Sequence, residues 1–258
     1  MDWIKESEMF NHASDYYDKL RPSYPKEIID LLISETGIKA KSKLLEIGAG
    51  SGKATELLTG KGFEILCIDH GEDLVKIGNN RFSDNKIRFK TVKFEECNLP
   101  RQYYDLVFSA QAFHWIPQPI GYEKCAYTLK RKKFLALFWN MYITYDNALD
   151  NELLNLSRKH GGFADFLSES ECENRINSIC SSIEGSKLFS KPKVFRKLWK
   201  QNYTANEYFG FVLTGNSFLK KNAEEKKFAH KDLITLADKY DGLIERPYLC
   251  VLYLSEKL

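Results

Sequence analysis

The chain has 258 residues, of which 43% are hydrophobic, and a formal net charge of +3. This length and composition suit one large domain, or a core with a lid, and the small charge gives no bias toward nucleic acid or a membrane surface. No stretch approaches the roughly 18 consecutive apolar residues of a membrane span, and residues 1–6 lack the pattern of a signal peptide.

Taken in chain order, apolar and amphipathic segments alternate as strands and helices do in a parallel α/β sheet. The predicted strands span residues 43–47, 64–69, 87–92, 105–110 and 134–139, and the predicted helices span 25–33, 73–81 and 123–130. Residues 194–203 and 246–255 alternate apolar and polar side chains, which is typical of an antiparallel pair that closes a sheet. We therefore expect one doubly wound α/β domain over residues 1–258, with a mostly parallel seven-stranded sheet.

Two segments stand out from this alternation. Residues 141–190 have a polar, helical pattern broken at Gly161 and Gly162, which we interpret as a helical insertion near the mouth of the active site. The basic run at residues 130–133 follows a predicted helix, and we expect its cations to complement the negative end of that helix. We interpret six further basic side chains as solvated: Lys187, Lys191, Lys193, Arg196, Lys197 and Lys200.

The cysteines and histidines give no sign of a metal centre. Six cysteines fall singly, without a C-x-x-C pair, and the histidines lack metal-ligand spacing. We interpret the cysteines as reduced residues of a cytoplasmic protein, and we expect no metal site.

The most informative segment is the first predicted strand and the glycine-rich turn after it, residues 44–52, with the sequence LLEIGAGSG. Glycines permit a tight strand-to-helix turn and the close approach of a ligand to the backbone. The helix that begins near Lys53 would offer free N–H groups to an anionic group. A second apolar strand ends in Asp69, seventeen residues after Gly52, where an acid would hold ribose hydroxyls. The segment therefore predicts a nucleoside-containing ligand.

The glycine spacing favours one ligand of that class. Dinucleotide-binding folds favour G-x-G-x-x-G, whereas the pattern here is E-x-G-x-G-x-G, with Glu46 two residues before the first glycine. A carboxylate there would repel a pyrophosphate and favour a cationic group. S-adenosylmethionine (SAM) carries an ammonium and a sulfonium group, so the spacing favours SAM over NAD; a glycine turn without a ligand is the alternative.

Further motifs extend this pattern over nearly the whole chain. FNHASDYYD occupies residues 10–18, RPSYP residues 21–25, AQAFHW residues 110–115 and FWN residues 138–140. In these motifs the chain resembles the class I SAM-dependent methyltransferases, of the small-molecule type that includes the trans-aconitate methyltransferases. The resemblance implies a Rossmann-like fold, SAM as the methyl donor and S-adenosylhomocysteine (SAH) as the product.

The resemblance also implies roles for residues at the strand ends. Glu46 and the glycines would line the methionine half of SAM, and Asp69 would accept hydrogen bonds from the ribose. The implied cofactor-binding residues are Tyr16, Tyr17, Arg21, Glu46, Gly48, Ala49, Gly50, Gly52, Asp69, His70, Phe94, Glu95 and Ala110. The implied catalytic residues, which follow the fourth predicted strand, are Gln111, His114 and Trp115.

Some of these roles have alternatives. Many relatives carry an acid where Lys93 stands, so the contact with the adenine amino group passes to Glu95, Glu96 or a backbone carbonyl. Phe94 either packs on the adenine or belongs to the core. His114 orients the acceptor, removes a proton from it, or hydrogen-bonds a backbone carbonyl.

The segment before the first strand, residues 1–34, is rich in aromatic and cationic side chains. In the family that the chain resembles, this segment folds over the cofactor as a lid. Tyr16 or Tyr17 would then close the site, and Arg21 would bind a carboxylate of SAM or of the acceptor. An ordinary first helix ending at Arg21 is the alternative, although the run at residues 21–25 does not fit a helix interior.

Together these features predict an enzyme that moves a methyl group from SAM to a small-molecule acceptor by in-line displacement. Positioning supplies most of the catalysis, and a carboxylate acceptor needs no general base. Two alternatives are an RNA or protein methyltransferase, disfavoured by the modest charge, and a SAM-binding regulator without transferase activity. The glycine spacing disfavours a nicotinamide-dependent oxidoreductase.

Overall fold

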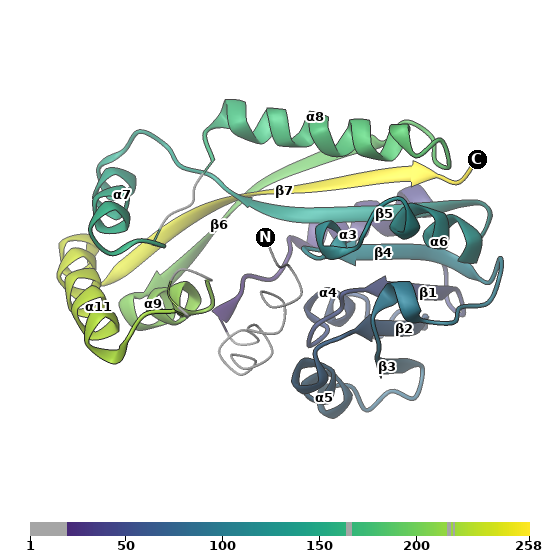
Figure 1. Cartoon of the computed structure of the whole chain (residues 1–258), viewed down its shortest axis with the longest axis horizontal. Coiled ribbons are helices and arrows are strands. Elements are labelled where there is room, and N and C mark those ends of the chain that lie inside the picture. Colours follow the sequence, from purple (N-terminus) through teal and green to yellow (C-terminus); the bar gives the residue numbers. More distant parts are fainter. Residues whose placement is uncertain (1–19, 164–166, 216–217, 219) are drawn as a thin grey trace. The chain divides into compact units, whose positions relative to one another are not determined.

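The computed structural model describes residues 20–163, 167–215, 218 and 220–258 (Figure 1). Its strands are β1 (Lys43–Ile47), β2 (Glu64–Asp69), β3 (Ile87–Thr91), β4 (Tyr104–Ala110), β5 (Leu129–Tyr142), β6 (Lys193–Thr204) and β7 (Leu243–Glu256). Its α-helices are α3 (Lys26–Thr36), α4 (Lys53–Glu56), α5 (Glu72–Arg81), α6 (Ile120–Thr128), α7 (Ala148–His160), α8 (Glu169–Gly185), α9 (Ala205–Leu213) and α11 (Ala223–Ala237). Short 3-10 helices are η1 (Phe94–Glu96), η2 (Phe113–Trp115) and η3 (Asp238–Tyr240).

The strands form one seven-stranded sheet in the order β3-β2-β1-β4-β5-β7-β6. The pairs β3–β2, β2–β1, β1–β4 and β4–β5 are parallel. Figure 1 shows β7 pointing opposite to β5 and β6, between which it lies. The expectation of a mostly parallel sheet is therefore wrong. The sheet is mixed, because β7, the last strand of the chain, runs antiparallel to both of its neighbours, β5 and β6 (Figure 1).

The chain divides into two compact units, each with its own core. The core unit comprises Ser23–Asn140, Glu173–Lys197 and Cys250–Leu258, and the helical unit comprises Met1–Pro22, Met141–Cys172 and Leu198–Leu249. Within the described residues, no helix is both long and apolar enough to cross a membrane.

Burial explains why the central strands of the core unit form. Leu44, Leu45 and Ile47 of β1 are 0% exposed, a near-continuous burial that is typical of parallel strands covered on both faces. The predicted bounds of β1 and β2 are confirmed. Because the carboxyl ends of parallel strands share one edge of a sheet, the segments after β1, β2, β3 and β4 become neighbours there.

The basic run at residues 130–133, which the sequence predicts to follow a helix, lies at the start of a strand. Helix α6 ends at Thr128, and the run opens β5, where the pairing with β4 shifts register between Tyr104 and Leu106. Lys130 Nζ lies 2.8 Å from Asp105 Oδ1. A carboxylate of β4 therefore pairs with one of the four basic side chains of this run.

In the helical unit, α7, α9 and α11 pack around buried side chains that include Phe163, Tyr208 and Leu233. Arg246 forms a buried ion pair with Asp150, and it also donates to the Ile143 carbonyl at 3.3 Å. The helical pattern predicted after residue 141 is confirmed for α7 and α8, while Met141 and Tyr142 end β5.

Candidate functional site

The glycine turn after β1 has two faces, one packed against protein and one open. Gly48, at φ 67°, approaches the next loop so closely that an added Cβ would lie 2.3 Å from the Cβ of Ala112. A Cβ on Gly52 would lie 2.6 Å from the Phe82 ring. At Gly50, with φ 54°, the nearest atom to an added Cβ is Leu74 Cδ1 at 4.0 Å. Among the described residues, Gly50 is thus the glycine of the turn that is held by its backbone conformation and whose surface is left open to a ligand.

Asp69 ties this turn to the end of β2. Its Oδ2 accepts from the Gly50 N–H at 2.8 Å, and its Oδ1 accepts from the Gly71 N–H at 2.8 Å. His70 Nδ1 lies 3.7 Å from Oδ1. Because an ionised carboxylate offers about four acceptor positions, two remain for donors such as hydroxyl groups.

Glu46 lies on β1 beneath the turn and is 1% exposed. The Thr55 hydroxyl donates to its Oε2, and the Cys67 thiol lies 3.9 Å from the same atom. Burial raises the pKa of Glu46 to about 8, and the charge of Asp69 adds to this rise, while the Thr55 hydrogen bond opposes it. The sequence placed Glu46 in the site as a charged group, whereas the structure holds it in surroundings that favour its protonated form.

The loop after β3 contributes η1, whose Phe94 is 3% exposed. Lys124 of α6 donates to the Glu95 carbonyl at 2.7 Å and lies 5.6 Å from the centre of the Phe94 ring. Phe94 is therefore part of the core. Its burial agrees with the second of the two roles that the sequence left open for it.

Gln111 follows β4 with a left-handed backbone, at φ 59°. Its N–H donates to the Phe138 carbonyl at 3.0 Å, and its Nε2 donates to the Asn140 carbonyl at 3.3 Å. Its Oε1 is buried without a hydrogen-bond partner among the described residues. An orphaned buried acceptor costs about 1–3 kcal/mol, and a ligand that carries a donor would remove this cost.

His114 and Trp115 lie on η2, which begins with buried Phe113 two residues after Gln111. The two rings are in contact, with centroids 4.7 Å apart. Trp139 Nε1 lies 3.3 Å from His114 Nδ1. Loss of hydration lowers the pKa of His114, and the positive charge of Arg175 on α8 lowers it further. Both effects favour the neutral form of the His114 imidazole.

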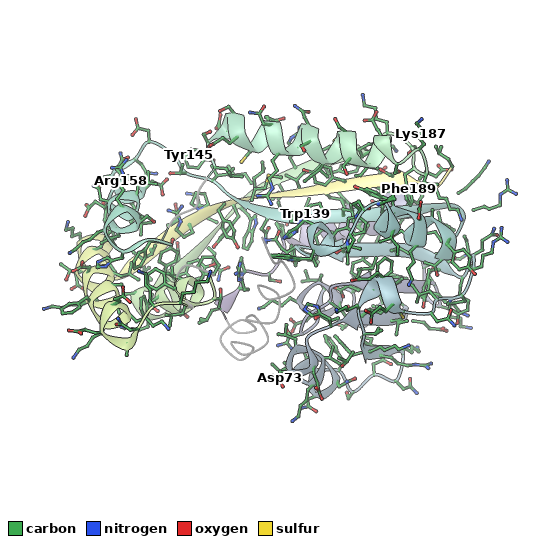
Figure 2. The ribbon with its side chains drawn as sticks, in the orientation of Figure 1. Asp73, Trp139, Tyr145, Arg158, Lys187 and Phe189 are labelled. Atoms are coloured by element: carbon green, nitrogen blue, oxygen red, sulfur yellow. The ribbon has the colours of Figure 1, made fainter. Side chains whose placement is uncertain are left out.

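Trp139 and Arg175 are residues that the sequence did not assign to the site. Trp139 is 5% exposed near the end of β5 (Figure 2). Its motif, FWN at residues 138–140, is visible in the sequence, and the strand end would have placed it beside the AQAFHW loop. Arg175 stands in a polar helix without any local signal.

The remaining predicted site residues lie elsewhere or outside the description. Arg21 belongs to the helical unit, where its Nη1 donates to the Tyr142 hydroxyl at 3.0 Å and its guanidinium lies 5.3 Å from the Phe211 ring centre. Tyr16 and Tyr17 fall outside the described residues. Ala49 and Ala110 are buried beside the turn and at the end of β4. The core unit thus brings together the predicted residues from Glu46 to Trp115.

Comparison with known proteins identifies the domain. Residues 45–136 match the family described as a methyltransferase domain. A Saccharomyces cerevisiae protein named "Probable S-adenosylmethionine-dependent methyltransferase" is 30% identical over 185 residues, which are 70% of this chain and 62% of that protein. An uncharacterized methyltransferase of Mycobacterium tuberculosis is 30% identical over 131 residues, which are 51% of each chain. The matched stretches therefore span about half to three-fifths of these relatives' length.

Solved structures agree at the level of the fold. A candidate type II methyltransferase of Anaeromyxobacter dehalogenans has a TM-score of 0.64 at 17% identity, over 91% of this chain and 97% of that one. A Haemonchus contortus N-methyltransferase in complex with phosphomonomethylethanolamine and SAH has a TM-score of 0.56 at 13% identity, over 99% of this chain and 59% of that one. Residues 45–136 therefore form a methyltransferase domain, and the chain has the Rossmann-like α/β fold of these solved methyltransferases.

Proposed function

We propose that this protein is a SAM-dependent methyltransferase that acts on a small-molecule acceptor, with a carboxylate as the first candidate. The observation that carries the proposal is the open face at Gly50 beside Asp69, in a turn that lies within the matched methyltransferase domain. The resemblance to the small-molecule enzymes that include the trans-aconitate methyltransferases supports this choice of acceptor class.

The residues at the ends of β1 and β2 fit SAM, which supplies a methyl group on a cationic sulfur when it is bound. The free acceptor positions of Asp69 suit the two ribose hydroxyls, and His70 lies beside them. The backbone of Gly48, Ala49, Gly50 and Gly52 would line the methionine half. The buried Glu46 carboxyl would face a cation, which favours its ionised form over the protonated one.

The other assigned residues would complete the site. Glu95 would border the adenine, with Phe94 packed in the core behind it, and the end of β4 at Ala110 would lie next to the adenine. Gln111, His114 and Trp115 would hold the acceptor, since the orphaned Oε1 of Gln111 needs a donor. Hydrogen bonds from these residues would orient the acceptor oxygen and exclude water, and such positioning is worth up to about 7–11 kcal/mol.

The N-terminal segment and the helical region complete the proposal. Residues 1–34 would act as the lid, with Tyr16, Tyr17 and Arg21 facing the ligands, and residues 141–190 would border the acceptor. The protein would act in the cytoplasm as one methyltransferase domain, without a metal ion. A test of the lid is whether Arg21→Ala raises KM for SAM or for the acceptor.

Charge pairing weighs against an RNA substrate. Of the six basic side chains that the sequence predicts to be solvated, four form ion pairs: Lys193 with Glu35, Arg196 with Glu173, Lys197 with Glu27 and Lys200 with Glu245. Paired cations release few counterions and give little affinity for phosphates.

The test is transfer of an isotope-labelled methyl group from SAM to panels of small carboxylates, small amines, RNA and proteins. We expect label on a carboxylate, loss of the label in Asp69→Ala, and wild-type transfer in Asp30→Ala, a matched change at an exposed residue of α3. Label on RNA or protein instead would establish that the enzyme is an RNA or protein methyltransferase. Tight SAM binding without transfer to any panel would establish the regulator.

A further inference from the structure

The contact between Trp139 and His114 fixes where the imidazole carries its proton. The indole Nε1 of Trp139 lies 3.3 Å from His114 Nδ1. An indole N–H can only donate, so Nδ1 must be the bare, accepting nitrogen. A neutral imidazole then carries its single proton on Nε2.

The surroundings of His114 favour this neutral form and leave Nε2 available. The ring contacts Trp115 on its own segment and Trp139 on β5, and the charged group that faces it is Arg175 of α8. The cation opposes a second proton on the ring. His114 keeps an exposed surface, and none of the described residues hydrogen-bonds its Nε2.

We propose that Trp139 holds His114 as the Nε2–H tautomer, so that His114 serves the methyl acceptor as a hydrogen-bond donor and not as a general base. Trp139 is then a positioning residue that acts through His114. The part of this inference that concerns the acceptor rests on the proposed function.

The fixed tautomer restricts the chemistry that the site can perform. His114 has no free lone pair, because Nδ1 accepts from Trp139 and Nε2 already carries a proton. The acceptor must therefore arrive without a proton to lose, as a carboxylate does. Its oxygen forms the new carbon–oxygen bond with one of its lone pairs, the electron pair of the broken carbon–sulfur bond stays on sulfur, and the Nε2–H hydrogen bond holds the oxygen in line. No proton passes through His114, so His114 assists carboxylates but gives alcohols and ammonium groups no general base.

The test is two-bond ¹H–¹⁵N correlation NMR of the full chain with ¹⁵N-labelled histidine, without any ligand. The signals of His114 are identified by their loss in His114→Gln. We expect the high shift of a bare nitrogen for Nδ1 and the lower shift of a protonated nitrogen for Nε2, unchanged between pH about 6 and 8. In Trp139→Phe both shifts should move toward the average of the two tautomers. Trp199→Phe, a matched change in the helical unit, should leave them unchanged.

Three results would overturn the inference. They are a protonated Nδ1 with a bare Nε2, a doubly protonated ring near neutral pH, and His114 signals that Trp139→Phe does not alter. The NMR test also separates failure of this inference from failure of the proposed function. If the protein shows the predicted NMR signature but transfers no methyl group, the claim about the His114 tautomer stands and the claim that His114 donates to a methyl acceptor is wrong.

A kinetic comparison extends the test once the labelling panels have given an acceptor. The side-chain nitrogen of Gln lies near the position of Nε2, whereas that of Asn lies near Nδ1. His114→Gln should therefore retain about tenfold more of kcat than His114→Asn. The opposite order would contradict the donor role.

Discussion

The two regions of the proposed site in the core unit, a cofactor side at the glycine turn and an acceptor side around His114, are built over different distances in sequence. At the glycine turn, Gly50 and Asp69 are 19 residues apart, and Glu46 and Thr55 are 9 apart. On the acceptor side, His114 and Trp139 are 25 residues apart, Gln111 and Asn140 are 29 apart, and Arg175 comes from a helix much later in the chain. The first region is encoded in one strand–turn–helix–strand unit. The second exists only after the sheet has assembled.

The largest effect is expected where the two regions touch. Gly48→Ala should destabilise the fold by about 3 kcal/mol or more, because overlap with Ala112 adds about 1–3 kcal/mol to about 1–2 kcal/mol of left-handed strain. Urea unfolding measures the loss. Gly60→Ala is the matched control, since Gly60 has φ 71° and no atom within 4 Å of an added Cβ. Equal losses in the two variants would show that the turn and the AQAFHW loop are not packed together as described.

The next effect is the pH dependence of stability that the buried carboxyl of Glu46 causes. A carboxyl whose pKa is about 8 in the fold and about 4.5 unfolded stabilises the fold fully below pH about 4.5, and this stability is lost as pH rises to about 8. The wild type should therefore lose a few kcal/mol relative to Glu46→Gln between pH 5 and 8, at about 1.4 kcal/mol per pKa unit. Urea unfolding of both proteins across this range measures the difference. Parallel pH profiles would mean that Glu46 is ionised in the fold.

Gly50→Ala should weaken SAM binding while it changes the stability of the fold little. Its added Cβ meets no atom closer than 4.0 Å, so the fold should lose only about 1–2 kcal/mol from strain at φ 54°, as in Gly60→Ala. The same Cβ would occupy the open face, so we expect at least a tenfold loss of SAM affinity by calorimetry, or about 1.4 kcal/mol. Unchanged affinity would mean that SAM does not approach this face.

The smallest effect concerns the acceptor side. Arg175→Gln removes an exposed cation that faces His114, so KM for an anionic acceptor should rise about three- to tenfold while SAM affinity stays unchanged. Steady-state kinetics at two salt concentrations measures this, with Arg158→Gln in the helical unit as the control. The same rise in KM for a neutral acceptor would contradict an electrostatic role.

The difference between the two regions also explains what the sequence predicted. The bounds of β1 and β2 and the strand-to-helix turn follow from apolar runs and glycines that are close in sequence. Helices α9 and α11 were not predicted, and the first part of β5 was assigned to the end of the predicted helix 123–130 and the basic residues after it. The mixed sheet depends on where β7 inserts, which a single sequence does not encode locally. Trp139 and Arg175 were missed as site residues for the same reason: their partner, His114, is distant in sequence.

The central claim is that the turn after β1 holds SAM. Calorimetric titration of the full chain with SAM, SAH and NAD tests it most directly, with Asp69→Ala as the site variant and Asp30→Ala as its control. We predict that SAM and SAH bind with Kd values of about micromolar, that Asp69→Ala weakens both at least tenfold, and that Asp30→Ala changes neither. Binding of NAD with no binding of SAM would contradict the claim.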